Sequence, residues 1–180
     1  NATTTCTIIN NDIPSGPQCV DETAGSWADT VVSSNQANTK AMGPITNPDR
    51  IDPTDTLGAE DWVTNGDTGF FSLGFGGSII LRFNSYVPNV AGTDLTVYEA
   101  TNGDTYPAET ATVEVSQNGT TWMLAGTANN ATIPGRTTDI DFDSTGLDWI
   151  TYVRITDTTN PVPHTNDADV SGLAREVANH

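Results

Sequence analysis

The feature that most constrains the fold is a series of short strand-like segments with no helical pattern between them. They are SIILRF (78–83), DLTVYE (94–99), ATVEVS (111–116), TTWMLAG (120–126), TTDIDFD (137–143) and TYVRITD (151–157). In the first segment Ile79, Leu81 and Phe83 face one way and Arg82 faces the other. Turns rich in Gly, Asn and Asp separate the segments. This pattern predicts an all-β fold, an antiparallel β-sandwich.

The rest of the chain adds fewer regular elements. The segments TTTCTII (3–9) and WADTVVS (27–33) have strand character, and Asn118-Gly119 predicts a hairpin turn between two strands. Residues 34–68 form a long irregular stretch, which is usually functional or held by an ion. The C-terminal LAREVANH is helix-friendly but short. We therefore expect one sandwich domain, residues 27–180, preceded by an extension, residues 1–26, that includes a possible donor strand.

Charge narrows the class of partner. Six Lys and Arg residues against 23 Asp and Glu give a formal net charge of -17. Nucleic acids and anionic membranes require cationic surface, so both are disfavoured as partners. Bound cations are favoured, above all Ca²⁺, which prefers hard oxygen ligands. No apolar run is long enough for a membrane helix, and the polar opening NATTT suggests a mature, processed form.

The cysteines and the sequons indicate an oxidising compartment. Cys6 and Cys19 lack nearby zinc ligands, so a disulfide between them is the better interpretation. Asn-x-Ser/Thr sequons begin at Asn1, Asn118 and Asn130, which makes these three residues candidate glycosylation sites. Together these features predict an extracellular or cell-surface protein.

From about residue 27 onward, the chain resembles a family of prokaryotic secreted and cell-surface proteins with a discoidin-like, galactose-binding-type jelly roll. The resemblance rests on WADTVVS, DPTDTLGAED, FFSLGFGGSIILRF, DLTVYEATNG, ATVEVSQNGTTW and YVRITD, in family order. It implies a jelly-roll sandwich, a surface location and no enzymatic activity. Related jelly rolls commonly hold a structural Ca²⁺ near the loop that reads DPTDTLGAED here. The chain departs from the family at NDADVSGLAREVANH, where only Asp167 and Asp169 match two acidic positions.

Two apolar strand rows end in an acid. Glu99 follows Leu95 and Val97, and Asp157 follows Val153 and Ile155. If these strand ends share a rim with Asp167 or Asp169, the group has enough oxygens for Ca²⁺. The alternatives are solvated strand ends or a catalytic acid. Asp94 lies five residues before Glu99, about 16 Å along a strand, and is excluded from the same ion.

A second candidate metal cluster lies in the long loop, and a hydrated acidic loop is its alternative. Its acids are Asp52, Asp55, Glu60 and Asp61.

Sequence support for catalysis is weak. His164 and His180 have no evident Ser or Cys partner, although a paired-carboxylate hydrolase stays open. The GFGG stretch, residues 74–77, leads into a strand and lacks a following Lys, so it is not a phosphate loop. Its glycines are instead expected to permit a bulge or a close backbone approach.

The function expected from the sequence is therefore non-catalytic. The main hypothesis is a Ca²⁺-stabilised surface sandwich for adhesion, or a filament subunit that self-associates by N-terminal strand addition. The alternative is a carbohydrate-binding module of a secreted protein, which predicts Trp or Tyr beside polar groups in a groove.

Overall fold

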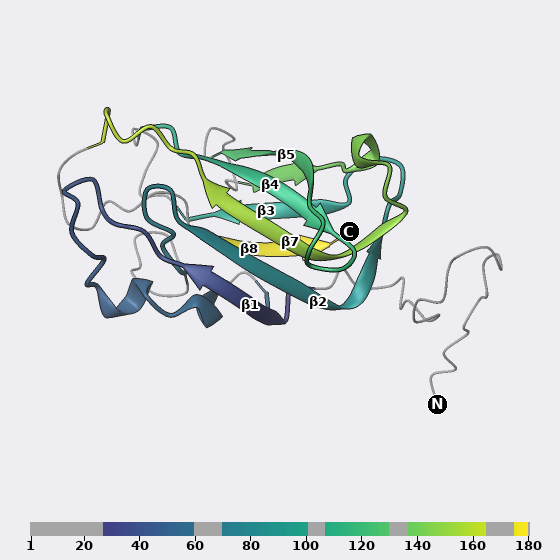
Figure 1. Cartoon of the computed structure of the whole chain (residues 1–180), viewed down its shortest axis with the longest axis horizontal. Helices are drawn as coiled ribbons and strands as arrows, with labels where there is room; N and C mark the ends of the chain where they lie inside the picture. Colours follow the sequence, from purple (N-terminus) through teal and green to yellow (C-terminus); the bar gives the residue numbers. More distant parts are fainter. Residues whose placement is uncertain (1–26, 60–69, 101–106, 130–136, 165–174, 180) are drawn as a thin grey trace.

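The computed structural model describes residues 27–59, 70–100, 107–129, 137–164 and 175–179, the last range as backbone only. Two antiparallel sheets pack face to face, as Figure 1 shows. The strands are β1 (Thr30–Asn35), β2 (Ser78–Pro88), β3 (Leu95–Glu99), β4 (Thr110–Ser116), β5 (Met123–Asn129), β6 (Thr137–Ile140), β7 (Trp149–Asp157) and β8 (Arg175–Asn179). The described residues also form the 3-10 helices η1 (Pro48–Arg50), η2 (Pro53–Thr56) and η3 (Asp143–Thr145).

The sheets confirm the predicted antiparallel β-sandwich. In the part of the chain that the structure describes, one sheet has five strands in the order β1-β2-β7-β4-β5, and the other has three in the order β6-β3-β8. Alternation places Ile79, Leu81 and Phe83 in the core, each at most 1% exposed, while Arg82 lies on the opposite, half-exposed face. Val113 and Val115 are fully buried as predicted. The helices among the described residues are all short, and none is long and apolar enough to cross a membrane.

Asp94 is a fully buried carboxylate that joins two corners of the sandwich. Its Oδ1 accepts a hydrogen bond from the Val90 amide at 2.8 Å, and its Oδ2 accepts one from the Phe142 amide at 2.9 Å. Buried polar groups require such partners, since desolvation without them is costly. Asp94 therefore has a structural role at the start of β3.

Two predicted elements differ from the structure. The hairpin between β4 and β5 is antiparallel as expected, but its connection runs over residues 117–122 instead of a two-residue turn. The Ser116 hydroxyl accepts from the Asn118 and Gly119 amides, and Asn118 Oδ1 accepts from the Thr121 amide. These side-chain bonds stabilise a longer loop and move the start of the second strand to Met123. The helix-friendly C-terminus forms β8, which pairs with β3.

The GFGG turn, residues 74–77, leads into β2 and packs against the loop that follows β1. A Cβ on Gly77 would lie 1.9 Å from the Leu73 carbonyl oxygen, and one on Gly74 would lie 2.3 Å from that of Ala37. Gly74 also has a φ of +75°. The predicted close backbone approach is confirmed at both positions, because no larger residue fits there.

Candidate functional site

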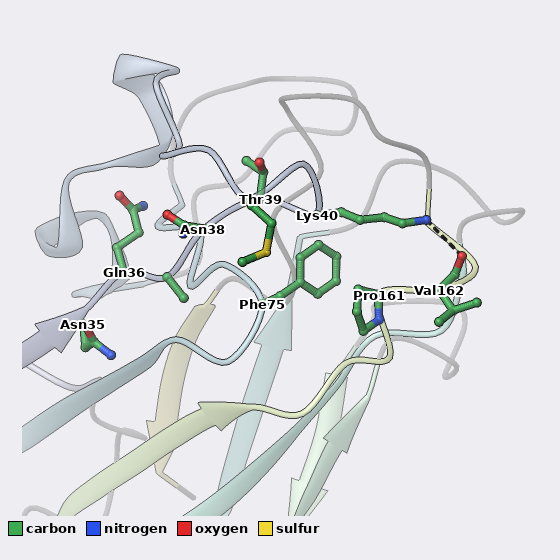
Figure 2. A pocket seen from close by; sticks show the side chains of 10 residues that line it. Asn35, Gln36, Asn38, Thr39, Lys40, Phe75, Pro161 and Val162 are labelled. Carbon is green, nitrogen blue, oxygen red and sulfur yellow. Dashed lines mark hydrogen bonds between the residues drawn. The ribbon is translucent and has the colours of Figure 1, made fainter.

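A cleft of about 570 Å³ opens at one end of the sandwich, where three separate loops meet. Asn35 ends β1 and residues 36–42 follow it, Phe75 comes from the GFGG turn, and residues 161 and 162 follow β7 (Figure 2). The lining residues are Asn35, Gln36, Ala37, Asn38, Thr39, Lys40, Met42, Phe75, Pro161 and Val162. The volume is that of an ordinary small-ligand site, and amides, a hydroxyl and apolar groups meet within it.

Backbone hydrogen bonds fix the GFGG turn against the first loop. The Ala37 amide donates to the Leu73 carbonyl at 2.8 Å, and the Phe75 amide donates to the Asn38 carbonyl at 3.0 Å. Gly74 allows this approach, as described above. The result is that the half-buried Phe75 ring projects between Lys40 and Pro161, as Figure 2 shows.

Lys40 joins the first loop to the loop after β7. Its Nζ donates a 3.0 Å hydrogen bond to the Val162 carbonyl and a second, short one to the His164 carbonyl. Figure 2 shows the side chain reaching across to Val162. Two backbone carbonyls therefore hold this ammonium group, and its main effect is to close one wall of the cleft.

Half-buried Gln36 and buried His164 fix the loops around the cleft. Gln36 Nε2 donates to the carbonyls of Arg50 and Ser72, at 2.9 and 2.8 Å. The His164 ring is 3% exposed and meets the Phe75 ring edge-on at 5.3 Å. Burial lowers the pKa of His164, and the charge of Lys40 lowers it further, whereas a hydrogen bond with the Ala108 backbone and the charge of Asp157 oppose these effects. His164 is therefore neutral at pH 7.

Met42 gives the cleft an exposed apolar edge. Its φ of 63° is in the left-handed region, the only such non-glycine residue among those described. Its side chain is 79% exposed, and Val162 on the loop after β7 is 76% exposed. A left-handed non-glycine backbone costs about 1 kcal/mol or more and is frequently found at ligand sites.

The structure places the predicted metal ligands in separate elements. Glu99 is 4% exposed at the end of β3, where its backbone pairs with that of Arg175 on β8. Asp157, 3% exposed, ends β7 in the other sheet. Its Oδ2 accepts from the Gly76 amide at 2.9 Å, and its Oδ1 accepts from the Thr159 hydroxyl at 2.6 Å. These bonds account for a buried carboxylate without an ion.

The acidic loop has a local structural role. Asp52 caps η2, because its Oδ1 accepts from the Thr54 hydroxyl and amide at 2.7 and 2.9 Å. Both bonds lower the pKa of Asp52, and the bond from the Thr54 hydroxyl has the larger effect. Within the described ranges, no three His, Cys, Asp or Glu side chains gather into a group that could hold a metal. The Ca²⁺ assignment therefore stays a prediction.

Several predicted site residues lie outside the described residues. They are Cys6, Cys19, Asn1, Asn130, Glu60, Asp61, Asp167 and Asp169. Of the sequons, the one at Asn118 is described: this residue is exposed in the β4–β5 connection, and the Thr120 hydroxyl donates to its Oδ1 at 2.8 Å. Glycosylation and the disulfide remain predictions.

Trp27, Trp122 and Trp149 lie among the described residues and make separate ring contacts. Trp27 pairs with Tyr98 at 5.2 Å and Trp149 with Tyr86 at 6.2 Å. The Arg154 guanidinium lies 4.6 Å from the Trp122 ring centroid and makes two 2.7 Å hydrogen bonds to Glu114, which raise the pKa of Arg154. The cleft instead uses Phe75, which sequence reasoning missed as a site residue.

Comparisons with known proteins give similarities of fold. No family model matches the chain, and no curated protein matches it. The CBM32 of AlyQ, solved in complex with 4,5-unsaturated mannuronic acid, is similar with a TM-score of 0.46 and 14% identity, over 85% of this chain and 97% of that one. The C-terminal domain of a chitobiase from Bacteroides fragilis is similar with a TM-score of 0.46 and 15% identity, over 86% and 93%. At these values we draw no function from them.

Proposed function

We propose that this protein is a non-catalytic carbohydrate-binding domain whose cleft takes a neutral glycan. The observation that carries this proposal is one cleft in which exposed Asn35 and Asn38 side chains accompany the Phe75 ring. A sugar presents hydroxyl edges, which amides can bond, and apolar C–H faces, which an aromatic ring can cover. The exposed Met42 and Val162 add apolar contact at the rim.

The charge of the chain favours a neutral ligand. With a net charge of -17, the protein repels carboxylated or sulfated glycans at long range. The one cation of the described lining, Lys40, already donates to two backbone carbonyls. An anionic sugar therefore finds little compensation for its desolvation in this cleft.

The residues of the described lining support binding rather than hydrolysis. None of them is Asp, Glu, His, Cys or Ser, and the Thr39 hydroxyl donates to the Gly43 carbonyl at 3.2 Å. Glycoside hydrolysis requires in most families a pair of carboxyl groups on either side of the scissile bond. A binding role requires only placed polar and apolar groups, which this cleft has.

A glycan array with the full chain tests the proposal. We expect binding to neutral glycans, with an affinity reduced at least about tenfold by Phe75→Ala and by Asn38→Ala, which corresponds to about 1.4 kcal/mol each. Val90→Ala, a change at an exposed residue in the β2–β3 connection, is the matched control and leaves the affinity unchanged. Absence of binding to every neutral glycan, or equal binding by the Phe75 and Asn38 variants, would overturn it.

A second candidate function is a subunit of an extracellular adhesive or filamentous assembly. The observation that favours it is that β5, an outer strand of the five-stranded sheet, contains no charged residue, so a strand of another copy can add to its edge. The candidate donor is the segment TTTCTII (3–9). Electron microscopy of the full chain and of a variant lacking residues 1–10 tests it: filaments formed only by the full chain support it, and filaments from neither or from both contradict it.

An extracellular location and a bound Ca²⁺ are part of the same proposal. We infer an extracellular location from the cysteine pair Cys6 and Cys19 and from the sequons. Ca²⁺ would be held at one of two places: by Glu99 and Asp157 with Asp167 or Asp169, or by the loop acids Asp52, Asp55, Glu60 and Asp61. The hard oxygen chemistry of these acids suits this ion.

A further inference from the structure

The β5 edge of the five-stranded sheet has an unusual surface for so acidic a chain. No charged residue lies between Glu114 and Arg136, although 16% of the chain is charged. Within this stretch, Leu124 is 62% exposed and Met123 is 39% exposed, both at the start of β5. Edge strands are normally protected from pairing by charged residues, and β5 has none.

The other strand edges of the described sheets are protected. The helix η2 packs against β1, and the exposed Asp29 directly precedes that strand. The strand β6 contains the exposed Asp139, and the sequence of β8 contains Arg175 and Glu176. Two copies that each carry a charge of -17 therefore approach with least like-charge repulsion along β5.

The neighbouring residues leave this surface electrically neutral. Glu114 pairs with Leu124 in the β4–β5 register, and its carboxylate is neutralised by the 2.7 Å bonds from Arg154. Trp122, which directly precedes β5, covers the Arg154 guanidinium. This acid, which pairs with Leu124 in the register, is thus compensated within its own copy, and an apolar contact next to it does not bury an unpaired charge.

We propose that β5 is a self-association edge, at which the β5 strands of two copies pair antiparallel about a two-fold axis. The contact is isologous, so Leu124 and Met123 of each copy become covered by the other copy. Main-chain hydrogen bonds between the strands provide the pairing, and the two five-stranded sheets become continuous. The proposal is independent of glycan binding in the cleft.

The structure also limits the strength of this dimer. A bulge at Ala125 interrupts the regular pairing of β5 with β4, and the Asn129 backbone is already bonded to the Thr138 hydroxyl on β6, at 3.1 Å in both directions. The usable edge is therefore the first part of β5. An interface this short is below the size of stable dimers, so we expect a dissociation constant on the order of 10 µM.

Sedimentation velocity of the full chain, over roughly 1 to 200 µM, brackets that constant. We expect the mass to rise reversibly from the 19.0 kDa monomer to a dimer. Leu124→Glu should weaken the dimer at least tenfold, because it places two like charges at the two-fold contact. Leu124→Gln, which is uncharged, serves as a second variant with a smaller effect, and Val90→Glu is the exposed-site control that leaves association unchanged.

The salt dependence of association distinguishes this apolar contact from an interface made by ion pairs. Added NaCl should strengthen the β5 dimer, because it screens the repulsion between two acidic copies and breaks no ion pair in the contact. A monomer at all concentrations, or a Leu124→Glu variant that associates like the unchanged chain, overturns the proposal. Association that salt weakens would also overturn it. So would association that is lost when residues 1–10 are deleted but is kept in Leu124→Glu, because the N-terminal segment would then make the contact.

Discussion

At the scale of single residues, His164 couples the stability of the fold to pH. It is buried against the Phe75 ring, and its own carbonyl accepts a hydrogen bond from Lys40. A proton on this imidazole would put a second cation close to Lys40 in a desolvated position. The neutral ring is therefore the form that the folded protein accommodates.

This coupling predicts a loss of stability in mild acid. The pKa of His164 is lowered in the folded protein by burial, whereas the unfolded chain takes up the proton near its ordinary value of 6.5. The contribution of His164 is thus fully present above that value and is lost as the pH falls through the folded pKa. Urea unfolding at about pH 7.5 and about pH 5.5 should show a smaller decrease for His164→Gln than for the unchanged chain. Equal decreases would contradict this account.

At the scale of elements, the GFGG turn determines where the cleft lies. Gly74 and Gly77 let the turn pack against the backbone at Ala37 and Leu73, and this packing directs Phe75 into the cleft. The turn is also hydrogen-bonded to Asp157 at the end of β7. The Asp157 amide donates to the Gly77 carbonyl, and the Asp157 carboxylate accepts from the Gly76 amide. A change in this turn therefore affects both the sheet and the site.

Substitution in the turn gives a prediction with an internal control. Gly77→Ala should lower the free energy of unfolding by about 3 kcal/mol, because its Cβ would overlap backbone that cannot move independently. Gly43→Ala, where the nearest atom to a Cβ is 4.0 Å away, should change it by less than about 1 kcal/mol. Denaturant unfolding of both variants measures this. A Gly77→Ala protein as stable as Gly43→Ala would show that the turn relaxes freely.

The strands were predictable because their signal is local. Alternation in SIILRF and ATVEVS matches a sheet with one buried face, and the structure has β2 and β4 there. β8 was not predictable, because LAREVANH has helix-forming residues and its strand state depends on pairing with β3. The cleft was missed for a similar reason: Asn38, Phe75 and Val162 are far apart in sequence, and amides are common throughout this chain. The GFGG glycines were the one available signal.

At the scale of the whole molecule, the net charge of -17 opposes folding, because it concentrates like charges in a compact state. Like charges repel one another in the compact state. Among the described carboxylates, those of Asp52, Asp94 and Asp157 are each stabilised by hydrogen bonds from backbone amides. A resident Ca²⁺ would reduce the repulsion that remains, but the described residues alone show no cluster for it.

Chelation decides whether the proposed Ca²⁺ is present. If the ion is bound at about 100 times its dissociation constant, its removal costs about 2.7 kcal/mol. For a chain of this length, that loss lowers the melting temperature by about 5 to 10 °C. Thermal unfolding with EGTA, and with EGTA followed by excess Ca²⁺, measures the effect and its reversal. Identical melting in all samples would exclude a stabilising calcium site.

The central claim, that the cleft binds a neutral glycan, is tested most directly by titrating isotope-labelled protein with a neutral glycan selected on the array and following the backbone amide signals by NMR. Glycan binding in the cleft should shift the signals of Asn38, Phe75 and Val162 most, and these shifts should be lost in Phe75→Ala. Shifts centred on another part of the sandwich, or no shifts at saturating glycan, would contradict it.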